Sequence, residues 1–183
     1  MSIELANHAA RRLLAACLGA TALAAVAPSI AATVEVKLVQ TPEGRTYFDP
    51  AGIHIAPGDT VRWVQMSGFH SITAYHPRND RHELRIPESA EPWDSDILLA
   101  AYPKPGSTFE HVFTVQGVYD YFCKPHEMAG MVGRIVVGDP GHDPAVKPFG
   151  YAPDRHWRPV PEAARHAFPP VAEILRKGTV AAR

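Results

Sequence analysis

The sequence predicts an all-β fold, a β sandwich of about seven short strands. Short segments in which hydrophobic and polar residues alternate recur along the chain, as in strands with one buried side. Turn signals separate these segments, and the 183 residues include 18 prolines and 13 glycines. Hydrophobic residues make up 46% of the chain, enough for a core between two packed sheets.

Seven segments have a strand-like pattern. The first alternates with Val34, Val36 and Leu38 on one face, and the second is interrupted at Pro50, where an edge position or a bulge is expected. In order, the expected strands cover residues 33–39, 47–55, 60–65, 70–75, 107–114, 118–123 and 131–137.

Two segments fall outside this pattern. Residues 76–106, rich in proline and charge, form a long insert before the last three strands, with one short helix expected at 95–101. Residues 139–183 form a C-terminal extension that we expect to be partly helical. Its helix would cover 161–177, although Pro169 and Pro170 would kink or split it. The domain itself would span 32–138.

Residues 1–31 have the features of a signal peptide. Arg11 and Arg12 precede an Ala- and Leu-rich run at 13–27, and the small residues Ser29 and Ala31 offer a cleavage site. This predicts a periplasmic or otherwise exported protein with no stable membrane span after cleavage. The arginine pair leaves Sec and twin-arginine export open, and Cys17 leaves a weaker lipoprotein alternative.

Cleavage would remove Cys17 and leave Cys123 as the only cysteine. Thiols outside the cytoplasm tend to oxidise, and this thiol has no partner in its own chain. It must therefore be buried, paired between chains or bound to a metal.

The residues around Cys123 favour the metal. His126 follows three residues later, Met131 five residues after that, and His70 opens an upstream strand. One thiolate, two imidazoles and a weak axial thioether are the ligand set of a copper electron-transfer site. Zinc would need more thiolates or another strong ligand. The sequence therefore predicts one copper ion bound by His70, Cys123, His126 and Met131.

Other candidate residues have simpler interpretations. Met128 is expected at the surface, where it would supply apolar surface around His126 together with Pro125 and Met131. A second metal site at His76 and His82, with Asp80 and Glu83 nearby, is an alternative to an ordinary solvated loop, which we favour. The remaining histidines of the mature chain are expected to face solvent: His54, His111, His142, His156 and His166.

Residues 117–126 and 131–133 resemble the copper loop of the cupredoxins, in the branch of plastocyanin, pseudoazurin and the halocyanin-like proteins. Azurins match less well because their Cys-to-His spacing is longer. The turn at 56–61, followed by Trp63, also resembles this family, and the resemblance covers about 34–137. It implies a cupredoxin-like Greek-key β sandwich, type 1 blue copper at the four ligands above, and electron entry through the edge of His126.

The chain departs from the family pattern in three places. Many relatives have Asn after the first His, where this chain has Ser71, and that neighbour helps to tie the two ligand loops together. The insert at 76–106 is longer than in plain plastocyanin, and the extension has no counterpart there.

These observations favour a soluble carrier of single electrons that exchanges them with a redox partner such as a cytochrome or a copper reductase. A copper chaperone or storage protein is the alternative, although it would favour several Met or His ligands on open segments. A multicopper enzyme would need His-x-His ligand groups, which the chain lacks, so we expect no catalytic residues. The net charge of −1 without a basic cluster argues against nucleic acid. We expect a monomer.

Overall fold

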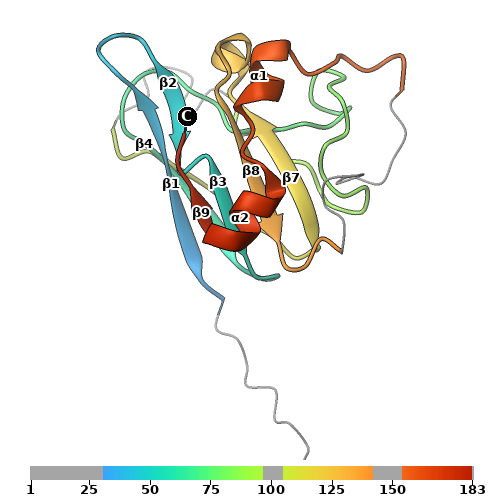
Figure 1. The fold of residues 1–183 in the computed structure, drawn as a ribbon. Coiled ribbons are helices and arrows are strands. Elements are labelled where there is room, and N and C mark those ends of the chain that lie inside the picture. Colours follow the sequence, from blue (N-terminus) through green and yellow to red (C-terminus); the bar gives the residue numbers. More distant parts are fainter. Residues whose placement is uncertain (1–30, 97–104, 142–153, 183) are drawn as a thin grey trace, which may run out of the picture.

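The computed structural model describes residues 31–96, 105–141 and 154–182, and its strands form two packed sheets (Figure 1). The first sheet has the order β2-β1-β4-β6, from β1 (Thr33–Gln40), β2 (Thr46–Asp49), β4 (Thr60–Gln65) and β6 (Thr108–Val112). The second has the order β5-β7-β8-β3-β9, from β3 (Gly52–Ile55), β5 (Thr73–Ala74), β7 (Gly117–Phe122), β8 (Val132–Val137) and β9 (Thr179–Val180).

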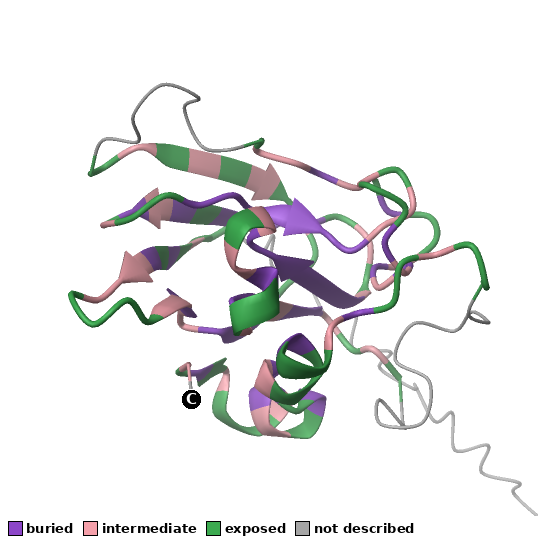
Figure 2. Ribbon diagram, turned by 90° about the horizontal axis from the view of Figure 1, so that it is seen from above, coloured by how far each residue is buried: buried purple, intermediate pink, exposed green. Residues whose placement is uncertain are grey.

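The all-β sandwich is therefore confirmed. Strands β1 and β4 are parallel, as are β3 and β8, and the other pairs are antiparallel. Buried and exposed residues alternate along strands such as β4, because successive side chains point to opposite faces of a sheet (Figure 2). Between the sheets lies a core rich in aromatic side chains: Phe48, Trp63, Trp93, Phe113 and Tyr121.

Two predicted strands differ from the structure. The segment 47–55 is not one interrupted strand, because β2 pairs with β1 and β3 pairs with β8 in the other sheet, so the chain changes sheets near Pro50. The segment 70–75 contributes only β5 (Thr73–Ala74). Two N–H groups just before β5 bond to side chains instead of a neighbouring strand: Ser71 to Cys123 and Ile72 to Ser95.

The insert packs against the sandwich. Trp93 and Ile86 are buried in the core, and the backbone of Arg85 bonds to both Tyr75 and Asp120 at distances of 2.9 and 2.8 Å. Most of the short helix expected at 95–101 lies outside the described residues. The described part of the insert therefore covers the edge of the second sheet beside β5 and β7.

The C-terminal extension also packs against the second sheet. It forms α1 (Glu162–Ala167) and α2 (Val171–Lys177), separated at Pro169 and Pro170, so the predicted helix is split. Strand β9, which the sequence did not predict, pairs with β3 and adds a strand after the three expected beyond the insert. Within the described ranges no helix is long and apolar enough to cross a bilayer. The expected signal peptide lies almost entirely outside them.

Candidate metal centre

A single tight loop between β7 and β8 contains three of the predicted ligands. Cys123 follows β7 directly, His126 lies in the 3₁₀ helix η1 (Lys124–Ala129), and Met131 comes just before β8. Gly130 ends η1 with a φ of 82°, a left-handed conformation that favours glycine. The N–H of His126 donates to the Cys123 carbonyl at 2.9 Å, and the N–H of Met131 donates to the His126 carbonyl at 3.1 Å.

The fourth predicted ligand, His70, approaches the loop from the segment between β4 and β5. The donor atoms of His70, Cys123 and His126 all lie within 4.8 Å of one another. Cys123 Sγ is 3.5 Å from His70 Nδ1 and 3.4 Å from His126 Nδ1. Bonds of about 2.0 Å from a metal to nitrogen and about 2.3 Å to sulfur, as in zinc sites, place these atoms roughly 3.5 to 3.7 Å apart at tetrahedral to trigonal angles. The three donors therefore fit around one metal ion.

Met131 lies against the same group. It is fully buried, shares the core cluster of Cys123, and accepts a bond of 3.1 Å from the Cys123 N–H. Its burial corrects the expectation that Met131 contributes to a surface rim. Met128 is 76% exposed, which confirms that it lies at the surface. A His-Cys-His set of two buried side chains and the half-buried His126, with a methionine beside it, is typical of a type 1 copper site.

Burial controls the protonation of the three metal-binding side chains before a metal binds. It raises the pKa of the Cys123 thiol to about 11, although the Ser71 N–H, 3.4 Å from Sγ, opposes the shift. Burial, together with the nearby His126, lowers the pKa of His70 to about 4, and burial also lowers the pKa of His126. At neutral pH both imidazoles are therefore neutral and free to bind a metal, whereas the thiol must first lose its proton.

Ser71 connects the two ligand loops through hydrogen bonds. Its Oγ accepts the Lys124 N–H at 2.8 Å and donates to Thr73 Oγ1 at 3.1 Å, and Thr73 in turn donates to Asp94 Oδ1 at 3.0 Å. Asp94, which belongs to the insert, also pairs with the Lys124 ammonium. The chain of bonds therefore closes on Lys124, the residue after Cys123.

Sequence reasoning missed another group of residues behind the loop. His82 is 2% exposed, and its Nε2 lies 3.2 Å from Oε2 of Glu127, the residue after His126. Tyr75 donates to the other carboxylate oxygen at 2.8 Å. The position of Glu127 beside a candidate ligand was the only signal in the sequence, and nothing there indicated that the insert would supply its partner.

The other histidines do not form a second metal site in the described residues, where the only group with metal-binding geometry is His70, Cys123 and His126. His82 is buried, so the favoured interpretation as a solvated loop residue is wrong for it. His111 is only partly exposed and stacks on Trp93 with ring centres 4.7 Å apart. His54, His156 and His166 are exposed as expected, and His142 lies outside the described residues.

Comparisons with known proteins agree with this geometry. Residues 34–138 match the model of the copper binding proteins of the plastocyanin/azurin family. Pseudoazurin of Methylorubrum extorquens is 32% identical over 130 residues, which are 70% of this chain and 78% of that protein. Plastocyanin of Scenedesmus fuscus is 37% identical over 95 residues, or 51% of this chain and 89% of that protein.

Among solved structures, a pseudoazurin from Sinorhizobium meliloti superposes with a TM-score of 0.51 at 29% identity, covering 80% of this chain and 98% of that one. The matched region contains both ligand loops and every strand except β9. The chain therefore belongs to the plastocyanin/azurin family of copper-binding proteins and is a blue copper electron-transfer protein.

Proposed function

We propose that the protein is an exported, monomeric carrier that takes up and delivers single electrons at one copper ion bound by His70, Cys123, His126 and Met131. The observation that carries the proposal is the buried convergence of one thiol and two imidazole nitrogens within 4.8 Å. When bound, copper supplies the one-electron Cu(I)/Cu(II) couple.

The protein's own contribution is to hold four donors in one arrangement. Cys123 and Met131 adjoin paired strands, and bonds within the loop fix His126 between them. Bonds through Ser71 fix the loop against the segment that carries His70. A donor set that moves little between the two oxidation states lowers the reorganisation that accompanies electron transfer.

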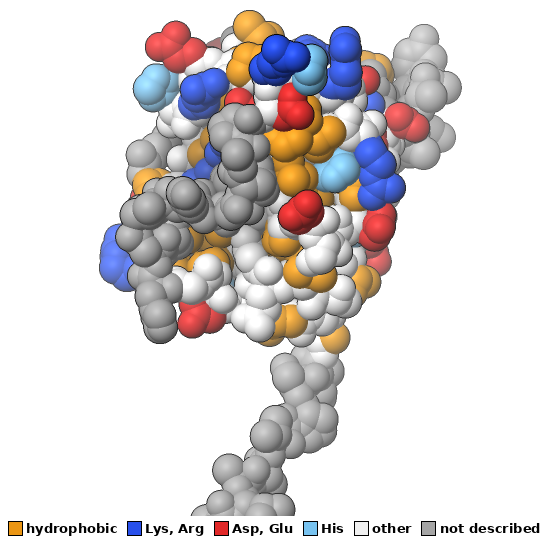
Figure 3. All heavy atoms as spheres, turned by 90° about the vertical axis from the view of Figure 1, so that its right-hand side faces the viewer, with side chains coloured by type: hydrophobic (Ala, Val, Ile, Leu, Met, Phe, Trp, Pro, Cys, Tyr) orange, Lys and Arg blue, Asp and Glu red, His pale blue; other side chains and the backbone are white. Residues whose placement is uncertain are grey.

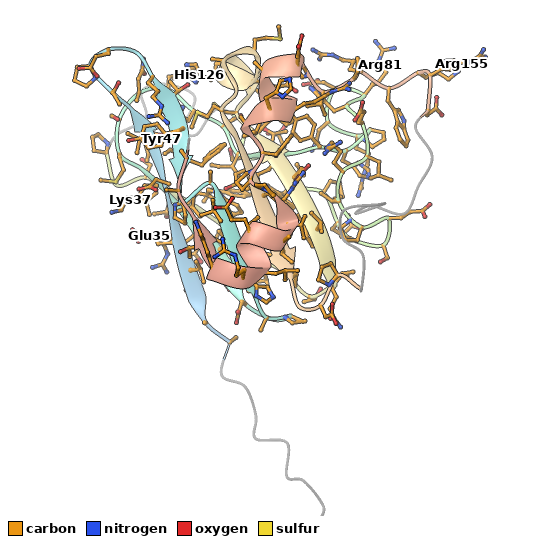
Figure 4. The ribbon with its side chains drawn as sticks, in the orientation of Figure 1. Glu35, Lys37, Tyr47, Arg81, His126 and Arg155 are labelled. Carbon is orange, nitrogen blue, oxygen red and sulfur yellow. The ribbon has the colours of Figure 1, made fainter. Side chains whose placement is uncertain are left out.

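The electron would pass through the His126 edge, where the ligand loops reach the surface. His126 is half-buried at the end of the molecule where η1 lies (Figure 4). Large exposed apolar side chains occur on both ligand loops: Met66 is 45% exposed, Phe69 43% and Met128 76%. These three residues, which we call the apolar rim, give a redox partner such as a cytochrome or a copper reductase a surface to dock against.

Surface charge should contribute less than the apolar rim to recognition of the redox partner. On the face that carries the insert, side chains of both signs lie near one another at the upper end, with hydrophobic side chains between them (Figure 3). The net charge is only −1. A surface of mixed sign gives little long-range steering, so contact through the apolar rim would decide recognition.

A copper chaperone or storage protein is the alternative. Such proteins release their metal, which favours ligands on open and flexible segments. Here His70, Cys123 and Met131 are fully buried, and the ligand loop is tied to its surroundings by several hydrogen bonds. The burial therefore supports the carrier.

The visible spectrum of the copper-loaded protein tests the proposal. We expect an intense band at the red end of the visible range from thiolate-to-copper charge transfer, and a redox titration of one electron per chain. Cys123→Ser should abolish the band, whereas Met128→Leu, a control at an exposed methionine, should leave it unchanged. A weak spectrum that Cys123→Ser does not alter would refute the carrier and favour storage.

The export proposal rests on the pattern of residues 1–31 and has its own test. Expression of the full chain in a Gram-negative host should yield a periplasmic protein that begins at residue 32, or one residue later, by mass spectrometry. Arg11→Lys together with Arg12→Lys would block export through a twin-arginine route and leave Sec export intact. Full-length protein in the cytoplasm would contradict the proposal.

A further inference from the structure

Three buried polar side chains meet behind the ligand loop. Tyr75 is 0%, His82 2% and Glu127 6% exposed. Tyr75 Oη donates to Glu127 Oε1 at 2.8 Å, and His82 Nε2 lies 3.2 Å from Glu127 Oε2. Both carboxylate oxygens therefore have a partner from outside the ligand loop.

The hydrogen bonds of His82 fix the orientation of its ring. Its Nδ1 lies 2.7 Å from the carbonyl oxygen of Asn79, which can only accept, so Nδ1 donates there and Nε2 faces Glu127. The Asn79 amide in turn donates to the carbonyls of Ala74 and Trp93 at 2.8 and 3.1 Å. The insert thus anchors the ring on the side away from the ligand loop.

The same group contacts the residues on both sides of the segment from Cys123 to His126. Glu127 directly follows His126, and Phe122 directly precedes Cys123. The Phe122 ring packs against His82, with ring centres 4.4 Å apart, and against Tyr75, with ring centres 4.5 Å apart. Two polar contacts to Glu127 and two ring contacts to Phe122 therefore fix the residues that flank two candidate ligands.

A buried carboxylate at this place has an energetic cost that an apolar side chain would avoid. Removing a carboxylate and an imidazole from water is unfavourable unless good hydrogen bonds compensate. In return, a satisfied network fixes one arrangement of the groups attached to it. Groups that orient metal ligands from behind have large effects on metal binding, of about 10- to 100-fold when they are changed.

We propose that His82, Tyr75 and Glu127 are positioning residues of the copper site, and that the insert serves to fix the ligand loop through them. This inference rests on the proposed function, because it concerns the same copper site. It assigns the insert a task in setting the geometry of His126 and Cys123, beyond covering the edge of the second sheet.

Two kinds of variant test the proposal. Tyr75→Phe removes one hydroxyl, and His82→Phe keeps an aromatic ring against Phe122 but removes both ring nitrogens and their polar contacts. The combined variant Tyr75→Phe, His82→Phe and Glu127→Leu removes the polar network as a whole and leaves no unpaired carboxylate, so its stability should recover relative to His82→Phe.

Three properties of the copper-loaded variants are measured: the reduction potential, the copper hyperfine splitting in the electron paramagnetic resonance spectrum, and the rate of Cu(II) transfer to a chelator. We expect the transfer to be about 10-fold faster in His82→Phe, with a shift in potential and splitting. We expect the combined variant to keep these changes although it regains stability. Ile174→Ala, a core variant in α2 behind β3, serves as a control that is destabilised without a change at the network.

The outcomes distinguish a failure of this inference from a failure of the proposed function. The inference is wrong, and the network only structural, if the copper properties of the combined variant return to the wild-type values when its stability recovers. It is also wrong if Ile174→Ala, at a similar loss of stability, changes the copper properties as much as His82→Phe does. Tyr75→Phe provides a mild change should His82→Phe fail to fold, and unchanged copper properties in it would also contradict the inference. A wild-type protein without the intense band would instead refute the proposed function itself.

Discussion

His70 couples the stability of the metal-free protein to pH. Its pKa is lowered from 6.5 to about 4 by burial and by the neighbouring His126. Between these values the unfolded chain binds a proton that the folded chain does not, so the free energy of unfolding decreases as the pH falls from 6.5 to 4. The loss at this one residue amounts to about 3 kcal/mol, and above pH 6.5 it vanishes.

Urea denaturation of the metal-free protein between pH 4 and 8 measures this effect. Other histidines contribute to the total slope, so the comparison is with His70→Gln, which has no titrating group at this place. The two stability curves should run parallel above pH 6.5 and approach each other below it. A difference that is independent of pH would show that His70 does not titrate as described.

Cys123 predicts the number of protons released when Cu(II) binds. Burial raises the pKa of its thiol to about 11, so the thiol is protonated at pH 7, whereas the low pKa of His70 and the lowered pKa of His126 leave both imidazoles neutral. Binding of the thiolate should therefore release one proton per copper ion, and the affinity should rise by about tenfold per pH unit. Calorimetry in two buffers of different ionisation enthalpy gives this number, and Cys123→Ser should release none. Two protons or more would mean that an imidazole is charged before binding.

At the scale of elements, α2 stabilises the fold through one side chain above all. Ile174 is fully buried against β3, where a Cβ on Gly52 would lie 2.8 Å from its side chain. Leu or Ile to Ala changes in such positions cost about 2 to 5 kcal/mol, because a cavity remains. We expect this loss for Ile174→Ala in the free energy of unfolding, measured with denaturant.

The copper site should not respond to that change. Ile174 packs in one cluster with Val118 and Val136, which pair at the end of β7 and β8 away from the ligand loop, so the visible spectrum and the reduction potential should stay at the wild-type values. Arg176→Ala, on the exposed side of the same helix, is the matched control and should change stability by less than about 0.5 kcal/mol. A stability loss as small as that of the control would show that α2 adds little to the fold.

The elements also show what the sequence could predict. Cys123, His126 and Met131 are close together in the sequence, and a tight loop between two strands allows few arrangements. The sequence was therefore enough to predict that these residues converge. Strands with clear alternation, such as β1 and β4, were also predictable. Strand β9 was not predicted, and the strand expected at 70–75 was too long, because the extent of both depends on pairing made only in the folded chain.

The contacts that hold the ligand loop in place could not be predicted from local sequence patterns, for the same reason. His82 and Glu127 are 45 residues apart, and Thr73 and Asp94 are 21 apart. Nothing in a charged, proline-rich insert distinguishes a buried histidine from a solvated one. Burial of polar side chains depends on which surface the insert covers, and this is a property of the tertiary structure.

At the scale of the whole molecule, the docking proposal predicts that the two ends of the sandwich differ in function. The apolar rim lies on the ligand loops beyond the end of β4 at Gln65. Val112, another exposed apolar residue at 52%, pairs with Thr60 at the opposite end of β4. If electrons pass through the His126 edge as proposed, electron exchange between two copies of the protein requires these edges to meet, so the exchange rate reports on docking at the rim without the physiological partner.

Adding a charge to the rim should therefore slow this exchange. In Met128→Lys, two like charges face each other when the edges meet, and we expect the electron self-exchange rate, measured by NMR line broadening in mixtures of Cu(I) and Cu(II) protein, to fall about tenfold at low salt. High salt should recover part of the rate, because it screens exposed charges. Val112→Lys adds the same charge at the far end and should change the rate little, and both variants should keep the wild-type spectrum and potential. Equal slowing by the two variants would mean that net charge, and not contact through the rim, governs the encounter, and the docking proposal would then be wrong.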